Sequence, residues 1–256
     1  MIEYRDIYKA FDAPVLAGIS LTVRDGERLS IVGPSGTGKS VLLKTTIGLV
    51  VPDRGDVLID GESVFFGGRG ALARVRRKVG FVFQNSALFD SMTVYENMRQ
   101  GIREDELARL EEPEVLARVS ASLGDVNLEP TRVLGKMPAE LSGGMRKRLG
   151  LARALVGRPR ILLYDEPVTG LDPVNTAAVT HLIAVIARRG VTSVIVTHDV
   201  EGALELSDRI ALLDRGRLVF VGTPDEFRAS EEPLVRAFAD RRAASRAALS
   251  LMEGAP

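Results

Sequence analysis

The sequence predicts an α/β fold with a central sheet that is largely parallel. From residue 160 onward, the apolar runs "RILLYDEP" and "TSVIVTHD" flank a helical stretch at residues 175–188. Strands that alternate with helices in this way are typical of parallel sheets covered by helices. The first third instead alternates short β-like runs with turns, which predicts hairpins. Residues 86–158 are rich in Glu, Arg, Leu and Ala, so we expect this region to be mostly helical.

Turn residues and glycines predict the order of the elements. Asp25-Gly26 predicts a hairpin within "SLTVRDGERLSIVG", and Asp60-Gly61 predicts a second within "GDVLIDGESV". Between them, residues 39–49 predict a helix that begins at a glycine-rich loop and stops near Gly48. "RIALLDRGRLVFVG" predicts a third hairpin close to the C-terminal end.

Composition and charge exclude several classes of protein. Lys and Arg total 34 and Asp and Glu total 34, so no overall field attracts nucleic acid or an anionic membrane, and we expect no nucleic-acid partner. Cysteine is absent, which excludes disulfides, thiol catalysis and cysteine metal sites. The two histidines, His181 and His198, are too few for a multi-histidine metal site. His181 lies in a helical stretch without a motif and is interpreted as a structural or surface residue.

The N-terminus and the apolar runs indicate no membrane segment. "MIEYRDIYKAF" carries charges at once and lacks the core of a signal peptide. No uninterrupted apolar run reaches the roughly 18 residues expected of a membrane span. We therefore expect a soluble, cytoplasmic protein, which a partner must place at a membrane if it works there.

A glycine-rich loop carries the strongest functional motif. "GPSGTGKS" fits G-x-x-x-x-G-K-[ST] at every fixed position, follows the apolar run "RLSIV" and opens a helix. Backbone N–H groups of such a loop surround phosphates, Lys39 adds charge for the β and γ phosphates, and Ser40 offers a hydroxyl to Mg²⁺. The predicted nucleotide-binding residues here are Gly33, Pro34, Ser35, Gly36, Thr37, Gly38, Lys39, Ser40 and Val41.

Polar side chains at the ends of three apolar runs complete the predicted site. Asp165 and Glu166 end "RILLYDE", where Asp165 would hold Mg²⁺ through water and Glu166 would orient or deprotonate the attacking water. His198 ends the next run, which we expect beside the first, so it should lie near the γ-phosphate. Gln84 ends "VGFVFQ", and its amide can contact Mg²⁺ or water. ATP and Mg²⁺ are the predicted cofactors.

A second anion site is predicted in "ELSGGMRKRLGLARAL". Ser142 has the features of a helix N-cap, and Gly143 and Gly144 allow a backbone to approach closely. The helix that follows presents its positive end to an anion. A phosphate already surrounded by the first loop leaves little room for this helix end from the same lobe. We therefore predict that two copies pair and that each supplies Ser142, Gly143 and Gly144 to the nucleotide of the other.

Taken together, these motifs resemble the ATP-binding-cassette (ABC) ATPases. "GPSGTGKS", Gln84, "LSGGM", "ILLYDEP", "TGLDP" and His198 occur in the order and spacing of that family, over about residues 1–225. The resemblance implies a P-loop NTPase fold with a mainly parallel core sheet, an antiparallel β subdomain and an inserted helical subdomain at 86–158. The residues it implies are Glu166, His198 and Lys39 for catalysis, Ser40, Gln84 and Asp165 for Mg²⁺, Phe11 for adenine stacking, and Leu171 and Asp172 for dimer contact.

A narrower resemblance is to lipid-transport ATPases of the maintenance-of-lipid-asymmetry and Mce-associated systems. Val41 stands where most cassettes have Thr, residues 80–98 are unusually apolar, and "ELSGGMRKR" follows. This resemblance implies a phospholipid-transport motor, peripheral on the cytoplasmic face of the inner membrane. Its expected partners are an integral-membrane permease, an Mce-domain substrate-binding protein and a second copy of the chain. Val168 departs from the Thr that family members often have, although an apolar residue there can still pack.

Two regions leave alternatives open. The segment with Ala87, Leu88, Phe89, Met92 and Val94 is either core of the helical subdomain or, as we favour from the resemblance, the patch that receives the permease. After the expected ABC domain at 1–225, a helical tail at 226–256 carries apolar residues that should pack on the core: Leu234, Val235 and Phe238. Residues 241–256 either fray or reach a second copy.

The resemblance also leaves two alternatives to lipid transport. The chain could power transport of another solute, because the cargo never touches the ATPase. It could also be a soluble, non-transport ATPase of the iron–sulfur assembly type, which is a single cassette as well. The apolar segment after Gln84 favours a membrane partner.

Overall fold

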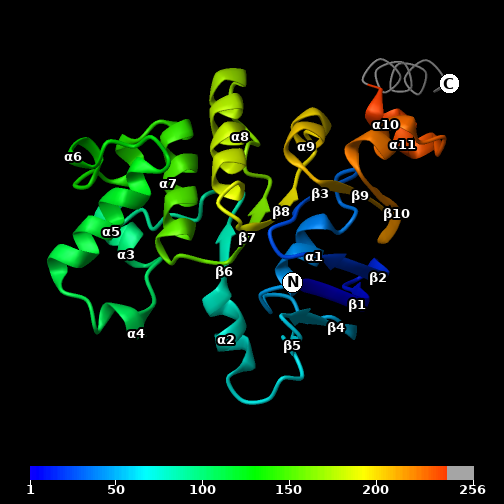
Figure 1. Cartoon of the computed structure of the whole chain (residues 1–256), viewed down its shortest axis with the longest axis horizontal. Helices are drawn as coiled ribbons and strands as arrows, with labels where there is room; N and C mark the ends of the chain where they lie inside the picture. The colour runs from blue at the N-terminus through cyan, green and yellow to red at the C-terminus, as the bar shows by residue number, and fades with distance from the viewer. Residues whose placement is uncertain (241–256) are drawn as a thin grey trace.

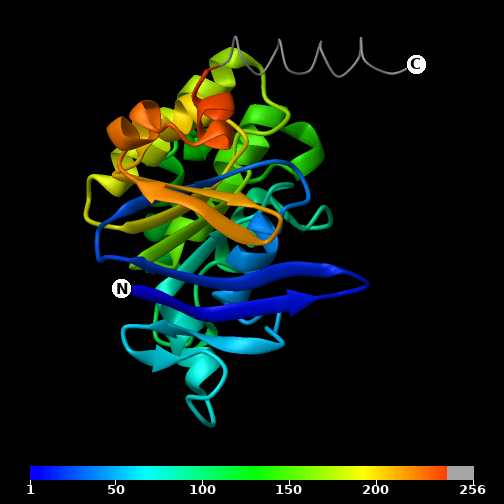
Figure 2. The same cartoon turned by 90° about the vertical axis from the view of Figure 1, so that its right-hand side faces the viewer.

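The computed structural model describes residues 1–240, which form two sheets and their covering helices (Figures 1 and 2). The strands are β1 (Ile2–Ala10), β2 (Pro14–Val23), β3 (Arg28–Val32), β4 (Arg54–Ile59), β5 (Glu62–Ser63), β6 (Val79–Val82), β7 (Ile161–Asp165), β8 (Thr192–Val196), β9 (Arg209–Asp214) and β10 (Arg217–Gly222). The helices are α1 (Lys39–Thr45), α2 (Ala71–Lys78), α3 (Val94–Arg99), α4 (Glu104–Leu107), α5 (Glu112–Gly124), α6 (Pro130–Val133), the 3₁₀ helix η1 (Pro138–Glu140), α7 (Gly143–Val156), α8 (Pro173–Ala187), α9 (Val200–Leu206), α10 (Pro224–Ala229) and α11 (Pro233–Ala239).

The larger sheet confirms the predicted parallel core. Its order is β10-β9-β3-β8-β7-β6, and all neighbours pair in parallel except β10, which pairs antiparallel with β9 as the third predicted hairpin. Every residue of β7 and β8 is buried, because helices cover both faces of the sheet. The carboxyl ends of β3, β7 and β8 meet at one edge, which gathers the segments that follow them.

The smaller sheet is antiparallel and has the order β2-β1-β4-β5. The hairpin at Asp60-Gly61 is confirmed, since Leu58 pairs with Ser63. The hairpin predicted at Asp25-Gly26 is wrong, because β2 pairs with β1 whereas β3 belongs to the other sheet. The buried strand β3 pairs with a parallel strand on each side, β8 and β9. The turn at Asp25-Gly26 therefore connects the two sheets.

Helix α1 lies between the two sheets and joins their cores. Leu42 and Leu43 belong to one buried cluster with Ile7 of the smaller sheet and Leu163 of the larger one. The helix ends at Thr45, shorter than predicted, and a turn with Gly48 at φ 64° follows it.

The region between β6 and β7 is helical, as predicted, and Figure 1 shows α3–α7 (green) grouped on one side of the strands. Its core includes Val119 and Leu123 of α5 and Leu149 and Val156 of α7, all fully buried. Helix α7 also lies beside the larger sheet, so its side chains can reach the strand ends.

The C-terminal helices pack against β9 and β10 (Figure 1). Val235 is buried, and Leu234 and Phe238 pack beside it, which confirms the predicted contact with the core. The predicted role of residues 241–256 lies outside the described residues. Within residues 1–240, no helix combines the length and the apolarity needed to cross a bilayer.

Candidate functional site

The loop between β3 and α1 has the backbone geometry that a phosphate cradle needs. Gly33 has φ 146°, and a Cβ there would lie 2.0 Å from the carbonyl oxygen of Leu213. Gly38 has φ 100°, and a Cβ there would lie 2.7 Å from the carbonyl oxygen of Val15. Gly36 has φ 79° and nothing within 4 Å of a Cβ position, so this part of the loop is open to a ligand. The glycines of the motif are therefore required by packing on one side and leave the other side accessible.

The ammonium of Lys39 lies across this loop. Its Nζ donates to the carbonyl oxygens of Gly33 at 2.9 Å and Pro34 at 2.8 Å. Burial lowers the pKa of Lys39, while the charges of Glu166 and Asp165 act in the opposite direction. A buried cation held by two backbone carbonyls can exchange those contacts for phosphate oxygens.

Ser40 and Asp165 lie together although they come from distant segments. The hydroxyl of Ser40 donates to Oδ1 of Asp165 at 2.6 Å, and Nζ of Lys44 lies 4.0 Å from Oδ2. The Asp165 side chain is 5% exposed, so water competes little for it. A hydroxyl and a carboxylate oxygen are hard ligands that suit Mg²⁺, which takes its other ligands from phosphates and water. The residues therefore fit the predicted ion.

Glu166 is held in place by contacts from three directions. Its backbone has φ 50°, an unusual value for a non-glycine residue, and its N–H donates to the carbonyl of Val196 at 2.9 Å. Its carboxylate oxygen Oε2 accepts from the Thr169 hydroxyl at 2.9 Å and lies 2.7 Å from Nδ1 of His198. The Glu166 side chain is 13% exposed and that of His198 60% exposed, so the pair opens toward solvent.

The second predicted anion site lies at the exposed end of α7. The Ser142 hydroxyl accepts from the Met145 N–H at 3.3 Å, which confirms the predicted N-cap. Ser142 and Gly143 are exposed, and within residues 1–240 neither makes a hydrogen bond to the phosphate loop. Gly144 is buried against Asn175, whose side chain donates to Asp172 at 2.5 Å. The predicted dimer contact at Asp172 is the N-cap of α8, so the two helix ends lie next to each other.

Two neighbouring glycines on α7 are predicted to differ in their effect on stability. A Cβ at Gly144 would lie 2.3 Å from Oδ1 of Asn175, whereas a Cβ at Gly143 meets nothing within 4 Å. Gly144→Ala must displace the Asn175 side chain from its hydrogen bond to Asp172, so its melting temperature should lie below that of Gly143→Ala. Gly143→Ala should leave the melting temperature unchanged or raise it, because Ala favours helix. Equal melting temperatures for the two variants would contradict this account of the contact.

Phe11 and Gln84 are both exposed. Phe11 is 62% exposed, so its ring is accessible to a flat ligand, and Nζ of Lys9 lies 5.3 Å from the ring centroid. Gln84 contributes a backbone contact, since its carbonyl oxygen accepts from Nζ of Lys147 at 2.5 Å. Val41 and Val168 are half-buried and pack on the core, and His181 is an exposed residue, as predicted.

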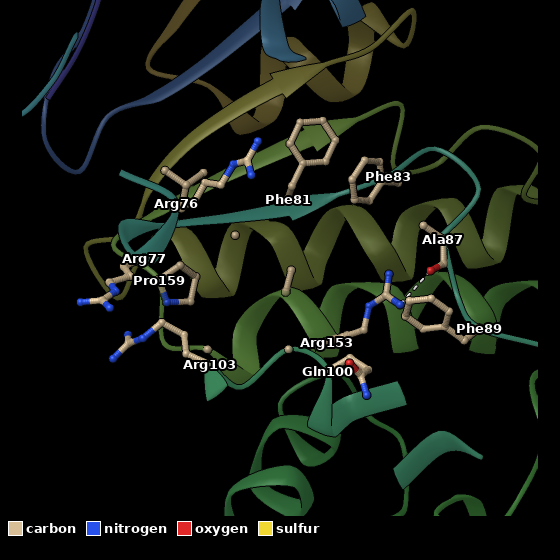
Figure 3. Close-up of a pocket in the computed structure, with 15 residues that line it drawn as sticks. Arg76, Arg77, Phe81, Phe83, Ala87, Phe89, Gln100, Arg103, Arg153 and Pro159 are labelled. Carbon is tan, nitrogen blue, oxygen red and sulfur yellow. Dashed lines mark hydrogen bonds between the residues drawn. The ribbon is translucent and has the colours of Figure 1, made fainter. Parts of the chain in front are cut away.

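A hollow of about 460 Å³ lies beside the segment that follows Gln84 (Figure 3). Its lining is aromatic and basic, with Phe81, Phe83, Phe89, Arg76, Arg77, Arg103 and Arg153. Arg153 is held by the carbonyls of Ser86 and Ala87 at 2.8 Å each, and its guanidinium lies 5.9 Å from the centroid of the Phe89 ring. Burial lowers the pKa of Arg153. The hollow thus combines apolar contact area with positive charge.

The residues of the predicted docking patch divide between this hollow and the core. Ala87 and Phe89 line the hollow, and Phe89 is 49% exposed. Leu88 packs on the helical core and Val94 is fully buried within it, so these two belong to the fold. Met92 is half-buried, and its carbonyl accepts from the side chain of Asn97.

Comparison with known proteins decides the family. A model described as ABC transporter matches residues 16–169. The chain belongs to the ABC transporter family. It is the ATP-binding motor of such a transporter, and the family is one of ATP-hydrolysing cassettes.

Three curated relatives and one solved structure illustrate the range of this ABC ATPase's relatives. The sulfate/thiosulfate import ATP-binding protein CysA of Caulobacter vibrioides is 43% identical over 90% of this chain and 67% of its own. The probable ribonucleotide transport ATP-binding protein mkl of Mycobacterium leprae is 40% identical over 94% and 69%. The chloroplastic protein TRIGALACTOSYLDIACYLGLYCEROL 3 of Arabidopsis thaliana is 37% identical over 93% and 73%. A dimeric post-hydrolysis structure of the cassette MJ0796 with ADP and Pi has a TM-score of 0.78 and 31% identity, over 88% of this chain and 99% of that chain.

Two side chains of this ABC ATPase's site were not predicted from the sequence. Thr169 fixes the Glu166 carboxylate from three residues downstream, a spacing that a turn after the strand allows. Lys147 reaches the strand ends from α7, a contact that depends on how the helix packs against the sheet and that no motif in the sequence indicates.

Proposed function

We propose that two copies of this ABC ATPase close around two ATP molecules. Each site would take its phosphate loop, Asp165 and Glu166 from one copy and Ser142–Gly144 from the other. The observation that carries this proposal is the exposed, capped end of α7, which makes no hydrogen bond to its own phosphate loop within residues 1–240. The dimeric state of the related MJ0796 cassette supports it.

The chain's own residues would carry hydrolysis mainly by positioning and charge. Glu166, oriented by His198 and Thr169, accepts a proton from the attacking water or aligns it. Lys39 exchanges the carbonyls of Gly33 and Pro34 for phosphate oxygens. Mg²⁺, held by Ser40 and Asp165, with Gln84 as a further predicted ligand, would neutralise charge on the phosphates. Loss of phosphate removes the anion that joins the two copies, and they separate.

The hollow of Figure 3 would receive a cytoplasmic segment of an integral-membrane permease. An exposed aromatic ring and basic side chains beside a concave surface offer both apolar area and polar contacts to such a segment. Closure of the two copies would then move the permease halves, with the chain at the cytoplasmic face of the inner membrane.

We propose a phospholipid or a related lipid as cargo, in a system with an Mce-domain protein. The apolar stretch 80–98, "ELSGGMRKR" and Val41 support this proposal through their resemblance to lipid-transport ATPases. The relative that carries the name of a galactolipid is compatible with it. Relatives named for sulfate and ribonucleotide transport make another solute the second candidate.

A mild-detergent purification of the tagged chain from its native membranes tests the transport proposal. Mass spectrometry should find a multi-span permease, an Mce-domain protein and bound phospholipid. A permease that co-purifies with a different solute-binding protein would contradict the lipid cargo. Recovery of a soluble scaffold protein in place of a permease would be consistent with the ATPase assignment but would contradict the transport proposal.

The same purification tests the docking surface with a matched pair of variants. Phe89→Asp places a charge in the hollow and should reduce the recovered permease at least about tenfold, the effect of losing an interface anchor. Phe66→Asp changes a phenylalanine that is 76% exposed outside the hollow and should leave recovery unchanged. Equal recovery with both variants would place the permease elsewhere.

A further inference from the structure

Lys147 connects the helical region to the ends of two strands. It lies on α7, further along the helix than the exposed residues Ser142 and Gly143. Its Nζ donates to the carbonyl of Gln84, just after β6, at 2.5 Å and reaches the carbonyl of Glu166, just after β7, at 3.5 Å. One side chain therefore contacts the segment beside the proposed docking hollow and the residue proposed for catalysis.

The position of this ammonium makes its contacts hard to replace with water. Lys147 is half-buried, and burial lowers its pKa while the charge of Glu166 acts in the opposite direction. A partly desolvated cation depends on the carbonyl oxygens around it. Its removal would leave those two carbonyls without this donor and without the positive charge beside Glu166.

Glu166 needs such support because its backbone is unusual. It has φ 50°, and surrounding contacts must hold a non-glycine residue there. The Val196 carbonyl fixes its N–H, and Thr169 and His198 fix its carboxylate. The contact from Lys147 comes from α7, so the peptide of Glu166 is tied to the helix whose exposed end is proposed to face a second copy.

The neighbouring cations on α7 do not share this position. Arg146 donates to the carbonyl of Leu141, which lies just before the same helix. Arg148 donates to the carbonyl of Asn127 at 2.9 Å, which lies after α5. The contact with both strand ends belongs to Lys147 among these three basic residues.

We infer that Lys147 is a positioning residue for ATP hydrolysis. Its contacts hold the Gln84 and Glu166 peptides at a fixed distance from α7. A shift of α7 relative to the sheet therefore changes the orientation of the Glu166 carboxylate. Movement of the docking segment or of the exposed end of α7 would therefore be transmitted to the Glu166 carboxylate through the contacts of Lys147. This inference rests on the ATPase activity of the family and on the proposed role of Glu166.

Steady-state ATPase kinetics of the purified full chain test this inference. Lys147→Met keeps the length of the side chain and removes its charge; we expect kcat to fall about 10- to 100-fold, with KM for ATP within about threefold, as for a group that acts in the transition state. Lys147→Arg retains a cation with several donors and should recover kcat to within about threefold of the native value. Arg132→Met, at an exposed cation on α6, is the control and should match the native chain.

The outcomes separate positioning from folding and from the role of Glu166 itself. A Lys147→Met chain with native kcat would overturn the inference. Equal losses of kcat in Lys147→Met and Lys147→Arg would also overturn it. The same holds if the fall in kcat is fully explained by a lower melting temperature of the variant. Hydrolysis of ATP at the native rate by Glu166→Gln would contradict the proposed catalytic role of Glu166. That measurement does not depend on any variant of Lys147.

Discussion

Glu166→Gln should lower kcat for ATP hydrolysis by about 10²–10⁴-fold, the usual contribution of a general base. The amide keeps the shape of the side chain and can still contact Thr169 and His198, so the backbone at φ 50° should hold. Binding of ATP should persist, because the phosphate loop and Asp165 are unchanged. The variant should therefore accumulate as a closed, ATP-bound dimer.

Size-exclusion chromatography with light scattering, run with ATP and Mg²⁺, measures this accumulation, and phosphate release measures the rate. The matched control is Glu205→Gln, a change of the same chemistry at an exposed position on α9. Hydrolysis at the native rate by Glu166→Gln would contradict Glu166 as the catalytic residue. Loss of hydrolysis without a closed dimer would contradict the proposed order of closure before hydrolysis.

Gly143→Glu should abolish most ATPase activity, although within residues 1–240 Gly143 makes no hydrogen bond to its own phosphate loop. A carboxylate at this position would face the phosphates held by the second copy, and like charges repel strongly when water is excluded. The expected loss is about 10²-fold or more, comparable to removing a key transition-state contact. The fold should tolerate the change, because nothing lies within 4 Å of a Cβ at Gly143.

Melting temperature and ATP-dependent dimerisation show whether the lost activity comes from a damaged fold or from a blocked contact with the nucleotide of the second copy. The nucleotide-free Gly143→Glu chain should melt like the native chain, and an acidic residue in the first turn of α7 favours the helix dipole. ATP-dependent dimerisation should be lost. Native turnover in this variant would show that the exposed end of α7 does not face a nucleotide.

The sequence predicted those parts of the site that depend on local patterns. The phosphate loop could be predicted because its glycines, its lysine and its serine are contiguous and follow a buried strand. The contact between Ser40 and Asp165 could be anticipated from topology, since β3 and β7 are parallel and flank β8. His198 beside Glu166 follows from the same rule.

Features that depend on three-dimensional packing could not be predicted in this way. Asp25-Gly26 has the composition of a hairpin turn, yet the apolar run after it pairs with strands far along the chain. Leu88 and Phe89 are neighbours of similar hydrophobicity, but one faces the helical core and the other the hollow. The reach of Lys147 to two strand ends depends on how α7 packs against the sheet, which no local pattern encodes.

Mixing two inactive variants tests most directly whether two copies share each nucleotide. Lys39→Ala removes the charge in the phosphate loop, and Gly143→Glu blocks the helix end, so each variant alone should be inactive. In a mixed dimer one site would combine the native phosphate loop of one copy with the native Ser142–Gly144 segment of the other. An equimolar mixture should therefore regain up to about a quarter of native ATPase activity, as random pairing in a two-fold dimer requires. A mixture as inactive as its components, under conditions where mixed dimers are shown to form, would contradict the shared site.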